Sequence, residues 1–267
     1  MVHFYKYHGT GNDFVIINMT PNSYSLTTEQ IALLCDRHKG IGADGLMMLI
    51  ASEDYDFKMK YYNSDGKEGS MCGNGGRCML AFAHDMGIIK EQYRFIAVDG
   101  EHEGRILKEH ATDKLVELKM SDVHETKLLN NNYEINTGSP HYLDFREEVE
   151  KLNVLEEGKA IRYSDTYKEE GINVNFVEQN QNHLFVRTYE RGVENETLAC
   201  GTGVTAAAIA SSIRQNLSHK NFDIKVLGGQ LNVKFQTEDG KSFHSIYLTG
   251  PTVFVFEGAI NIHKLTC

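Results

Sequence analysis

The sequence predicts an α+β protein made of two similar halves. Short runs of aromatic and β-branched residues outnumber the helical segments and are interleaved with them, which favours a mixed class. A cysteine followed by Gly-x-Gly occurs twice, at Cys72 and at Cys200. The two cysteines lie 128 positions apart in a chain of 267 residues, which is close to half its length.

Eight segments have the composition of strands. They are rich in Val, Ile, Phe, Tyr and Thr, whose side chains pack well on a pleated surface. In chain order they are HFYKYH (3–8), FVIIN (14–18), YYN (61–63), YRFIAV (93–98), LVELKM (115–120), LFVRTY (184–189), LNVKF (231–235) and TVFVF (252–256).

Three segments predict helices. LTTEQIALLCDRH (26–38) has Thr27 as a candidate N-cap with Gln30 three residues later, and its apolar residues fall on one face. The other two helices follow Cys72 and Cys200, and a run of alanines between 206 and 210 strengthens the last one. Each of these cysteines therefore lies at or beside a first helical turn.

The repeat extends beyond the cysteines. A shift of 128 positions aligns DGLMML (44–49) with INVNFV (172–177), and MKYYN (59–63) with RTYER (187–191), without gaps. The order of strand, loop, cysteine and helix is kept, so we infer two halves related by a pseudo-two-fold axis. The segment 120–135, where charge and Asn content rise, is the best candidate for the crossing between them.

Composition limits the partners. The formal net charge is −10 and no dense run of Lys or Arg occurs, which argues against nucleic acid and membranes but allows a small anionic substrate. The N-terminal MVHFYKYHGTGNDF lacks the pattern of a secretory signal, and no apolar run approaches the roughly 18 residues that span a bilayer. We therefore expect a cytoplasmic protein.

The cysteine count supports the same expectation. Five cysteines occur, an odd number, and we expect them to be reduced in the cytosol. No Cys-x-x-Cys pair is present to close a zinc site, so we expect no metal. Cys35, Cys78 and Cys267 lack the Gly-rich setting, and we expect the first two to be packing residues and the third to belong to a tail.

The setting of Cys72 and Cys200 suits acid/base chemistry at a carbon atom. A helix N-terminus lowers the pKa of a thiol and binds carboxylates, and glycines let backbone amides approach a ligand. Racemisation at an amino-acid α-carbon needs a base on one face and an acid on the other, roles that a thiolate and a thiol can exchange. Amides of two helix ends would face the charge that develops on the carboxylate, so neither metal nor pyridoxal phosphate is required.

Other interpretations remain open on the residues alone. Cysteine is often buried simply as packing. A peptidase or amidase would use one cysteine as nucleophile with His141 as its base. A binding module would hold phosphate in the Gly-rich turns, although no Walker Lys-Ser/Thr or GxGxxG fingerprint occurs. Ordinary roles in turns, loops or the surface also fit Asn12, Asn63, Asn173, His141, Glu190 and Arg191.

Several motifs, in order, resemble one family. They are KYHGTGNDFVIIN, CDRHKGIGADGLMML, YYNSDGKEGSMCGNGGRC, NTGSPHYL, GINVNFVE, VRTYERGVENETLACGTGVTAAA and LTGPTVFVFEG. They cover most of the chain from 3 to 258, and the two cysteine blocks are highly specific as a set. On these residues the sequence resembles the diaminopimelate epimerases, which are cofactor-independent amino-acid epimerases.

The resemblance implies a fold and an activity. The activity is interconversion of LL- and meso-diaminopimelate, on the route to lysine and peptidoglycan precursors. Each half is expected to be a mostly antiparallel sheet wrapped on a central helix, with the active site in the cleft between the halves. The first half would cover 1–119 and the second 120–254, with a last strand at 255–267 returning to the first half. Family members are commonly homodimers.

The resemblance also implies site residues, carried over by position. Cys72 and Cys200 would be the acid/base pair, and His141 and Glu190 would influence their protonation. Arg191 would hold the distal carboxylate, since a guanidinium binds one in two-point fashion. The implied substrate-binding set is Asn12, Asn63, Gly73, Asn74, Asn173, Glu190, Arg191, Gly201 and Thr202, with Gly45 and Ser139 as further candidates.

Two positions depart from the family pattern. Ser139 stands where members often have the Asn of an Asn-Pro-His segment, and Gly45 stands where some have Gln. Both changes fall among substrate-holding positions, so they bear on substrate identity more than on reaction type. The same chemistry on proline or histidine is the nearest alternative, although Arg191 and the asparagines favour a long, doubly zwitterionic substrate.

Overall fold

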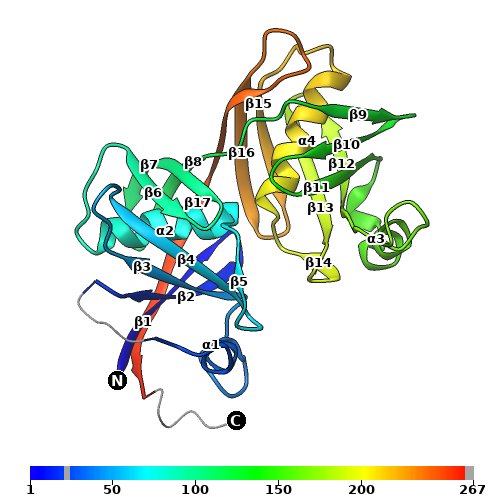
Figure 1. The fold of residues 1–267 in the computed structure, drawn as a ribbon. Coiled ribbons are helices and arrows are strands. Elements are labelled where there is room, and N and C mark those ends of the chain that lie inside the picture. Colours follow the sequence, from blue (N-terminus) through cyan, green and yellow to red (C-terminus); the bar gives the residue numbers. More distant parts are fainter. Residues whose placement is uncertain (21–24, 262–267) are drawn as a thin grey trace. The chain divides into compact units, whose positions relative to one another are not determined.

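The computed structural model describes residues 1–20 and 25–261 (Figure 1). The contacts within the chain divide it into two compact units. Unit 1 comprises Met1–Leu118 and Gly250–Cys267, and unit 2 comprises Lys119–Thr249. Each unit has its own set of paired strands and its own buried helix.

Unit 1 is a mostly antiparallel arrangement of strands. Only β2 with β3 and β4 with β6 run parallel among its pairs with a described register. Its elements are β1 (Val2–Gly9), β2 (Asn12–Asn18), α1 (Thr28–Cys35), β3 (Gly45–Ile50), β4 (Phe57–Asn63), β5 (Glu68–Gly69), α2 (Gly73–Asp85), β6 (Tyr93–Ala97), β7 (Gly100–His110) and β8 (Asp113–Lys119).

Unit 2 repeats this arrangement. Here the parallel pairs with a described register are β11 with β12 and β13 with β15. Its elements are β9 (Thr126–Leu129), β10 (Asn132–Asn136), β11 (Pro140–Phe145), a short 3₁₀ helix η1 (Val149–Lys151), α3 (Val154–Arg162), β12 (Asn173–Asn180), β13 (His183–Glu190), β14 (Asn195–Thr197), α4 (Gly201–Arg214), β15 (Asn221–Val226) and β16 (Gly229–Gln236).

The last strand, β17 (His244–Ile260), belongs to both units. Its first part pairs with β16 of unit 2, as far as Asn232 opposite Thr249. Its second part pairs with β1 of unit 1, from His8 opposite Val253 to Val2 opposite Ile260. The predicted strand at 255–267 lies partly beyond the described residues, which end at 261.

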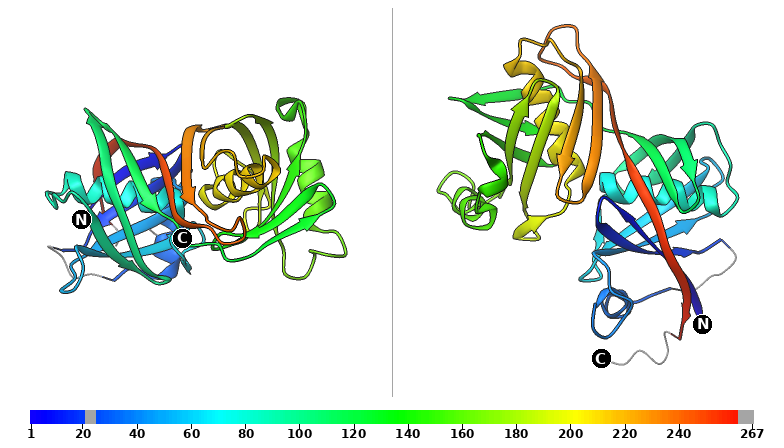
Figure 2. Two further views of the ribbon diagram at one scale, coloured as in Figure 1. Left: turned by 90° about the horizontal axis from the view of Figure 1, so that it is seen from above. Right: turned by 180° about the vertical axis from the view of Figure 1, so that it is seen from behind.

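Both central helices are enclosed by their own strands. Helix α2 contacts β1, β2, β3 and β7, and α4 contacts β10 to β13, β15 and β16. Figure 2 shows α4 surrounded by the strands of unit 2. Small and apolar residues lie all round α4, so the helix has no polar face to leave in water. Full burial of a side chain such as Ile209 stabilises the fold by about 1.5–3 kcal/mol.

The structure keeps the offset of 128 that relates the two cysteines. Equivalent elements begin that far apart: β3 and β12 at Gly45 and Asn173, α2 and α4 at Gly73 and Gly201, and β6 and β15 at Tyr93 and Asn221. The parallel pairs recur at equivalent places. The predicted α+β class with two similar halves is therefore confirmed.

Most local predictions are also confirmed. Every predicted strand segment coincides with a strand, apart from Val98 and Met120, which lie one residue beyond β6 and β8, and the three predicted helices form as α1, α2 and α4. At α1 the Thr27 hydroxyl accepts from the Gln30 amide at 3.3 Å, and Gln30 Oε1 accepts from the Thr27 amide at 3.0 Å. No helix within 1–20 and 25–261 is both long and apolar enough to cross a membrane.

Helix α3 was not predicted, and Gly158 in its middle explains why. Glycine disfavours helices because it loses the most conformational freedom. Packing requires it here, since a Cβ at Gly158 would lie 2.4 Å from the Cβ of Tyr189 on β13. Asn153 caps the helix by accepting from the Glu156 amide at 3.3 Å.

Candidate active site

Cys72 is the N-cap of α2. Its backbone is extended, with φ −102° and ψ 150°, and its Sγ accepts a hydrogen bond from the Gly75 amide at 3.2 Å. A helix N-terminus favours a negative charge, so this bond is stronger to a thiolate than to a thiol. A Cβ at Gly75 would lie only 3.2 Å from both Cys72 Sγ and Met47 Sδ, so glycine gives the sulfur its room.

A buried cation lies in the second turn of the same helix. Arg77 is fully buried and donates to Gly73 O at 3.3 Å, to Thr10 Oγ1 at 3.3 Å and to Asn74 Oδ1 at 3.0 Å. These three partners are neutral. Burial lowers the pKa of Arg77 to about 10, so the guanidinium is still charged at neutral pH. Its charge adds positive potential near the start of α2.

Asn74 connects α2 to the strands of unit 1. Its Nδ2 donates to Asn12 Oδ1 at 3.2 Å, and Asn12 Nδ2 donates to Asp44 Oδ2 at 2.7 Å. Arg37 pairs with Asp44 at 2.8 Å and with Asp13 at 2.8 Å. Two predicted substrate-binding residues, Asn12 and Asn74, therefore touch directly.

Gly45 and Asn63 lie opposite each other on β3 and β4. A Cβ at Gly45 would lie 2.6 Å from Tyr61 Cε2 and 2.7 Å from Tyr62 O, so a larger residue would displace the tyrosine ring. Asn63 is exposed at the end of its strand. Asp44, which bonds to Asn12, directly precedes Gly45. Unit 1 therefore places Gly45 and its neighbour Asn63 near the Asn12–Asn74 pair.

Cys200 is the N-cap of α4. Its backbone is extended, with φ −119° and ψ 110°, and the residue is 6% exposed. The surroundings differ from those of Cys72, because Cys200 Sγ lies 3.4 Å from the hydroxyl oxygen of Thr202. The next residue, Gly201, begins the helix, and its carbonyl accepts from Thr205 Oγ1 at 2.9 Å.

Ser139 joins several predicted residues of unit 2. Its Oγ lies 3.3 Å from Thr202 Oγ1, 3.0 Å from His141 Nε2 and 3.2 Å from Asn173 Nδ2. These side chains come from the start of β11, the start of β12 and the first turn of α4. The structure therefore brings Ser139, His141, Asn173, Thr202 and Cys200 into one hydrogen-bonded group.

His141 is fully buried, and both ring nitrogens have partners. Nδ1 lies 3.1 Å from Asn175 Nδ2, and Nε2 lies 3.0 Å from Ser139 Oγ. Burial, helped by the nearby charge of Arg191, lowers the pKa of His141 to about 3. The ring is neutral at physiological pH and is a weak base, which argues against a Cys–His nucleophile pair.

Asn173 and Arg191 are linked by a backbone contact. The Arg191 amide donates to Asn173 Oδ1 at 2.9 Å, and Asn173 Nδ2 donates to Pro140 O at 3.0 Å. The Arg191 side chain is exposed and donates to Glu170 O at 3.0 Å. Gly171, at φ +75°, leaves room for it, because a Cβ there would lie 2.7 Å from Arg191 Cδ.

Glu190 precedes Arg191 at the end of β13. Its Oε2 accepts a hydrogen bond from Thr197 Oγ1 of β14 at 2.9 Å. Because β13 pairs with β14, the Thr197 hydroxyl is held where it can bond to this oxygen of the carboxylate.

The remaining cysteines are core residues where they are described. Cys35 is 3% exposed and Cys78 fully buried. Burial raises the pKa of Cys35 to about 12 and also raises that of Cys78, so neither forms a thiolate readily. Their predicted packing role is confirmed, whereas Cys267 lies outside the described residues.

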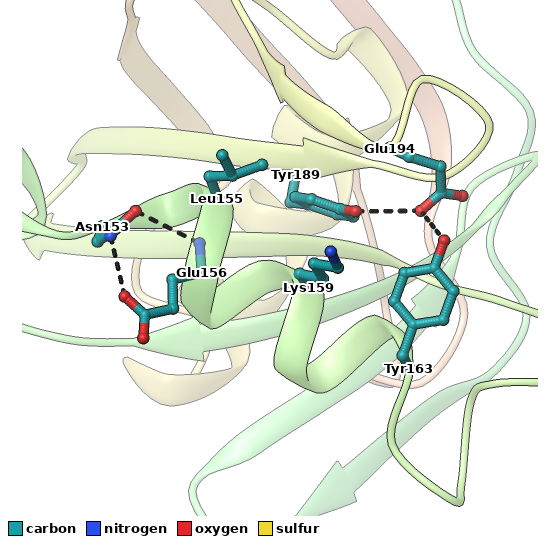
Figure 3. A pocket seen from close by; sticks show the side chains of 7 residues that line it. All are labelled: Asn153, Leu155, Glu156, Lys159, Tyr163, Tyr189 and Glu194. Atoms are coloured by element: carbon teal, nitrogen blue, oxygen red, sulfur yellow. Dashed lines mark hydrogen bonds between the residues drawn. The ribbon is translucent and has the colours of Figure 1, made fainter.

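One cavity of about 320 Å³ lies in unit 2 beside α3 (Figure 3). Its polar groups largely satisfy one another: Glu194 accepts from Tyr163 at 3.0 Å, from Tyr189 at 3.1 Å and from the Gly192 amide at 3.0 Å. The predicted site residues are not among its lining, which is Asn153, Leu155, Glu156, Lys159, Tyr163, Tyr189 and Glu194.

One cluster in the described chain has the ligand types of a metal site. Side-chain atoms of His84, Asp85 and Glu109 lie within 4.8 Å of one another. Lys114 already pairs with this cluster, at 2.6 Å from Asp85 and 3.2 Å from Glu109. The ammonium group supplies the positive charge that an ion would otherwise bring.

Sequence reasoning missed two residues that support the site. Asn175 follows Asn173 by two positions in an apolar strand, so both side chains point to the same face of the sheet. Two asparagines at this spacing in the sequence could have indicated a buried polar site on that face. Arg77, a lone charge in a small and apolar helix, was a second such signal.

Comparison with known proteins identifies the family of this chain. The family model for diaminopimelate epimerase matches residues 4–124 and 133–255. A protein of Flavobacterium psychrophilum named diaminopimelate epimerase is 47% identical over 96% of this chain and 99% of its own length. Proteins of the same name from Chlorobaculum tepidum and Aquifex aeolicus are 41% and 37% identical, over 95% and 97% of this chain and 99% and 97% of theirs.

Solved structures show the same fold at low identity. A PhzF-family phenazine biosynthesis protein of Bacillus anthracis has a TM-score of 0.76 at 14% identity, covering 97% of this chain and 99% of its own. A probable proline racemase from Agrobacterium radiobacter has a TM-score of 0.71 at 13% identity, covering 98% and 93%. The sequence relatives decide the family, and this chain belongs to the diaminopimelate epimerases.

Proposed function

We propose that this chain is an isomerase that interconverts LL- and meso-diaminopimelate, in the synthesis of lysine and peptidoglycan precursors. Membership of the family, at 47% identity to a relative of that name, supports the substrate. The observation that carries the mechanism is the pair of equivalent helices, α2 and α4, each capped by a cysteine.

The proposed reaction is a proton exchange at the α-carbon. One thiolate removes the α-proton and becomes a thiol, while the electron pair from the broken C–H bond spreads into the substrate carboxylate. The other thiol then delivers its proton to the opposite face and becomes the thiolate. In the reverse direction Cys72 and Cys200 exchange roles, so no net proton is consumed.

Backbone amides would stabilise the charge that develops on the carboxylate. The proposal assigns this role to the first turns of the two helices, at Gly73-Asn74 and Gly201-Thr202, where amides lack intrahelical acceptors. It requires both thiols to reach opposite faces of one α-carbon while substrate is bound.

The other predicted residues would hold the rest of the substrate. Arg191, whose side chain is exposed, would bind the distal carboxylate through its guanidinium. Asn12, Asn63 and Asn173 would bind the polar groups of the substrate, and Glu190 would influence thiol protonation. Gly45 would contribute only backbone.

The proposal includes no metal and no organic cofactor. It also places the enzyme in the cytoplasm, where thiols stay reduced, and as a homodimer, as is common in the family. Light scattering on the purified protein measures the oligomeric state: a mass of twice 30.2 kDa is expected, and a monomer would contradict the dimer.

A substrate panel tests the assignment. The reduced protein is incubated separately with LL-diaminopimelate, L-proline and L-histidine, and the isomers are separated by chiral chromatography. We expect product from diaminopimelate alone. Turnover of proline or histidine without turnover of diaminopimelate would contradict the substrate and leave the reaction type standing.

A variant tests the distal contact. Arg191→Met keeps much of the stem but removes the guanidinium, and we expect KM for diaminopimelate to rise by about tenfold or more. The matched control is Arg162→Met, a second arginine beside Gly171 that the proposal leaves out of substrate binding. An equal rise in KM in both variants would contradict a specific role for Arg191.

A further inference from the structure

A continuous series of hydrogen bonds leads to the Cys200 sulfur in unit 2. It runs from Asn175 to His141 at 3.1 Å, to Ser139 at 3.0 Å, to Thr202 at 3.3 Å and to Cys200 Sγ at 3.4 Å. Asn175 and His141 are fully buried, so water does not replace these inner contacts.

The inner end of the series has a fixed direction. Asn175 Nδ2 lies 3.1 Å from the carbonyl oxygen of Tyr142, which can only accept, so this atom is the amide NH₂. Thr188 Oγ1 donates to Asn175 Oδ1 at 2.9 Å on the other side. Asn175 therefore donates to Nδ1 of His141, and the neutral ring carries its proton on Nε2.

The proton on Nε2 of His141 determines which groups donate at the outer end of the series. His141 Nε2–H donates to Ser139 Oγ, and Asn173 Nδ2 also donates to it. A hydroxyl has two acceptor sites and one donor, so both acceptor sites of Ser139 are filled. Its own hydrogen must point to the third neighbour, Thr202 Oγ1.

Thr202 then has one hydrogen left to give. Its oxygen already accepts from Ser139, and Cys200 Sγ, at 3.4 Å, is the other described neighbour of this oxygen, so the sulfur is the acceptor left for its hydroxyl hydrogen. Such a donor stabilises a thiolate. It disfavours a thiol that would donate in the opposite direction, because Thr202 would then accept from both neighbours and its own hydrogen would have no acceptor among its described contacts.

We propose that Asn175, His141, Ser139 and Thr202 form an oriented relay that holds a hydroxyl donor on Cys200 and so favours its thiolate. The inference rests on the proposed function in one respect, namely that Cys200 exchanges protons with substrate. It makes Ser139 a positioning residue, because its hydroxyl has no remaining capacity for a substrate contact. It also gives His141 a part that does not require the ring to titrate.

The two cysteines are then stabilised by different means. Cys72 Sγ accepts from the Gly75 amide and has the buried charge of Arg77 in the second turn of the same helix. The position equivalent to Arg77, 128 residues later, is Thr205, whose hydroxyl bonds to Gly201 O. The relay therefore supplies on α4 what a buried cation supplies on α2.

Alkylation of the individual thiols tests the relay without any substrate. Iodoacetamide labelling of the native protein is followed by peptide mass spectrometry across pH 5 to 10, which gives a separate midpoint for Cys200 and for Cys72. Ionisable or charged groups on the neighbouring elements are His141 on β11, Glu190 at the end of β13, Arg191 directly after it, and Glu196 on β14. Glu196 is already paired with Arg187 at 2.6 Å.

In Thr202→Val the donor is lost while shape is kept. We expect the Cys200 midpoint to rise by about 1 pH unit, and that of Cys72 to stay where it was. Ser139→Ala should raise it by a smaller amount, because Thr202 stays but loses its orientation. Thr202→Ser keeps the hydroxyl and should restore the midpoint of the parent protein.

The matched control is Thr205→Val, the same substitution one turn along α4. Its hydroxyl bonds to Gly201 O and has no part in the relay, so the Cys200 midpoint should not move. An unchanged midpoint in Thr202→Val, or an equal rise in Thr205→Val, overturns the relay. Circular dichroism on each variant confirms folding before labelling.

Failure of the relay and failure of the proposed function give different results. If the relay is wrong, the Cys200 midpoint is insensitive to Thr202 while diaminopimelate is still epimerised. If the function is wrong, diaminopimelate is not turned over, but the midpoints still move as the relay predicts.

Discussion

At the scale of single residues, burial decides which groups are charged. His141 is fully enclosed and its pKa falls to about 3, whereas the ordinary value is 6.5. Between those two pH values the unfolded chain binds a proton at this residue that the folded chain excludes. Stability is therefore complete above pH 6.5 and is lost as the pH falls toward 3.

This dependence predicts a measurable effect of His141→Gln. Each pH unit below 6.5 costs about 1.4 kcal/mol for one excluded proton, so His141 should account for about 2 kcal/mol between pH 7 and pH 5. Urea unfolding of both proteins at the two pH values gives the difference. The variant should lose less stability on acidification than the parent, and an equal loss in both would contradict the assignment.

Some residues of the site were readable from the sequence and others were not. Thr27 and Gln30 form a capping box that depends only on local spacing, and the Gly-rich starts at Cys72 and Cys200 are equally local. The contact between His141 and Asn175 was not readable, because Asn175 reaches the ring only through the pairing of β12 with β11. The sequence shows that Gly45 offers no side chain. It does not show why, because the ring of Tyr61 that leaves no room for a Cβ comes close only in the folded structure.

At the scale of elements, the starts of α2 and α4 are packed too tightly for added atoms. A Cβ at Gly203 would lie 2.3 Å from Oδ1 of Asn175, the inner member of the relay that leads to Cys200. A Cβ at the equivalent Gly75 would meet Cys72 Sγ and Met47 Sδ at 3.2 Å each, which are ends of flexible side chains.

The difference predicts unequal effects of the same substitution. Gly203→Ala should destabilise the protein by about 1–3 kcal/mol, because Asn175 is held on both sides and cannot move away. Gly75→Ala should cost less, since Met47 can change rotamer. Thermal unfolding of the two variants decides this, and a larger loss in Gly75→Ala would contradict the packing argument.

At the scale of the whole molecule, one strand serves both units. Strand β17 pairs with β16 in unit 2 and then with β1 in unit 1. The ring of Phe254 lies 5.3 Å from that of Tyr7 in unit 1, while Leu248 is fully buried in unit 2. The repeat in the sequence indicated two halves, but a single strand shared by both is a property of pairing over long range.

Two substitutions on this strand should loosen different units. Phe254→Ala should increase hydrogen exchange in β1, and Leu248→Ala should increase it in β16, each by removing about 2–4 kcal/mol of local packing. Mass spectrometry of the exchanged peptides measures deuterium uptake in both units in one experiment. If Phe254→Ala loosened β16 as much as β1, the division of β17 between the units would be wrong.

The central claim is that two thiols act on opposite faces of one α-carbon, and isotope exchange tests it most directly. The reduced parent, Cys72→Ala and Cys200→Ala proteins are each incubated with LL-diaminopimelate in D₂O, and product and α-deuterium are measured. The parent should form meso product carrying deuterium, and each variant should lose epimerisation by about 10²–10⁴-fold or more. Parent-like epimerisation in either folded variant would contradict the two-thiol mechanism.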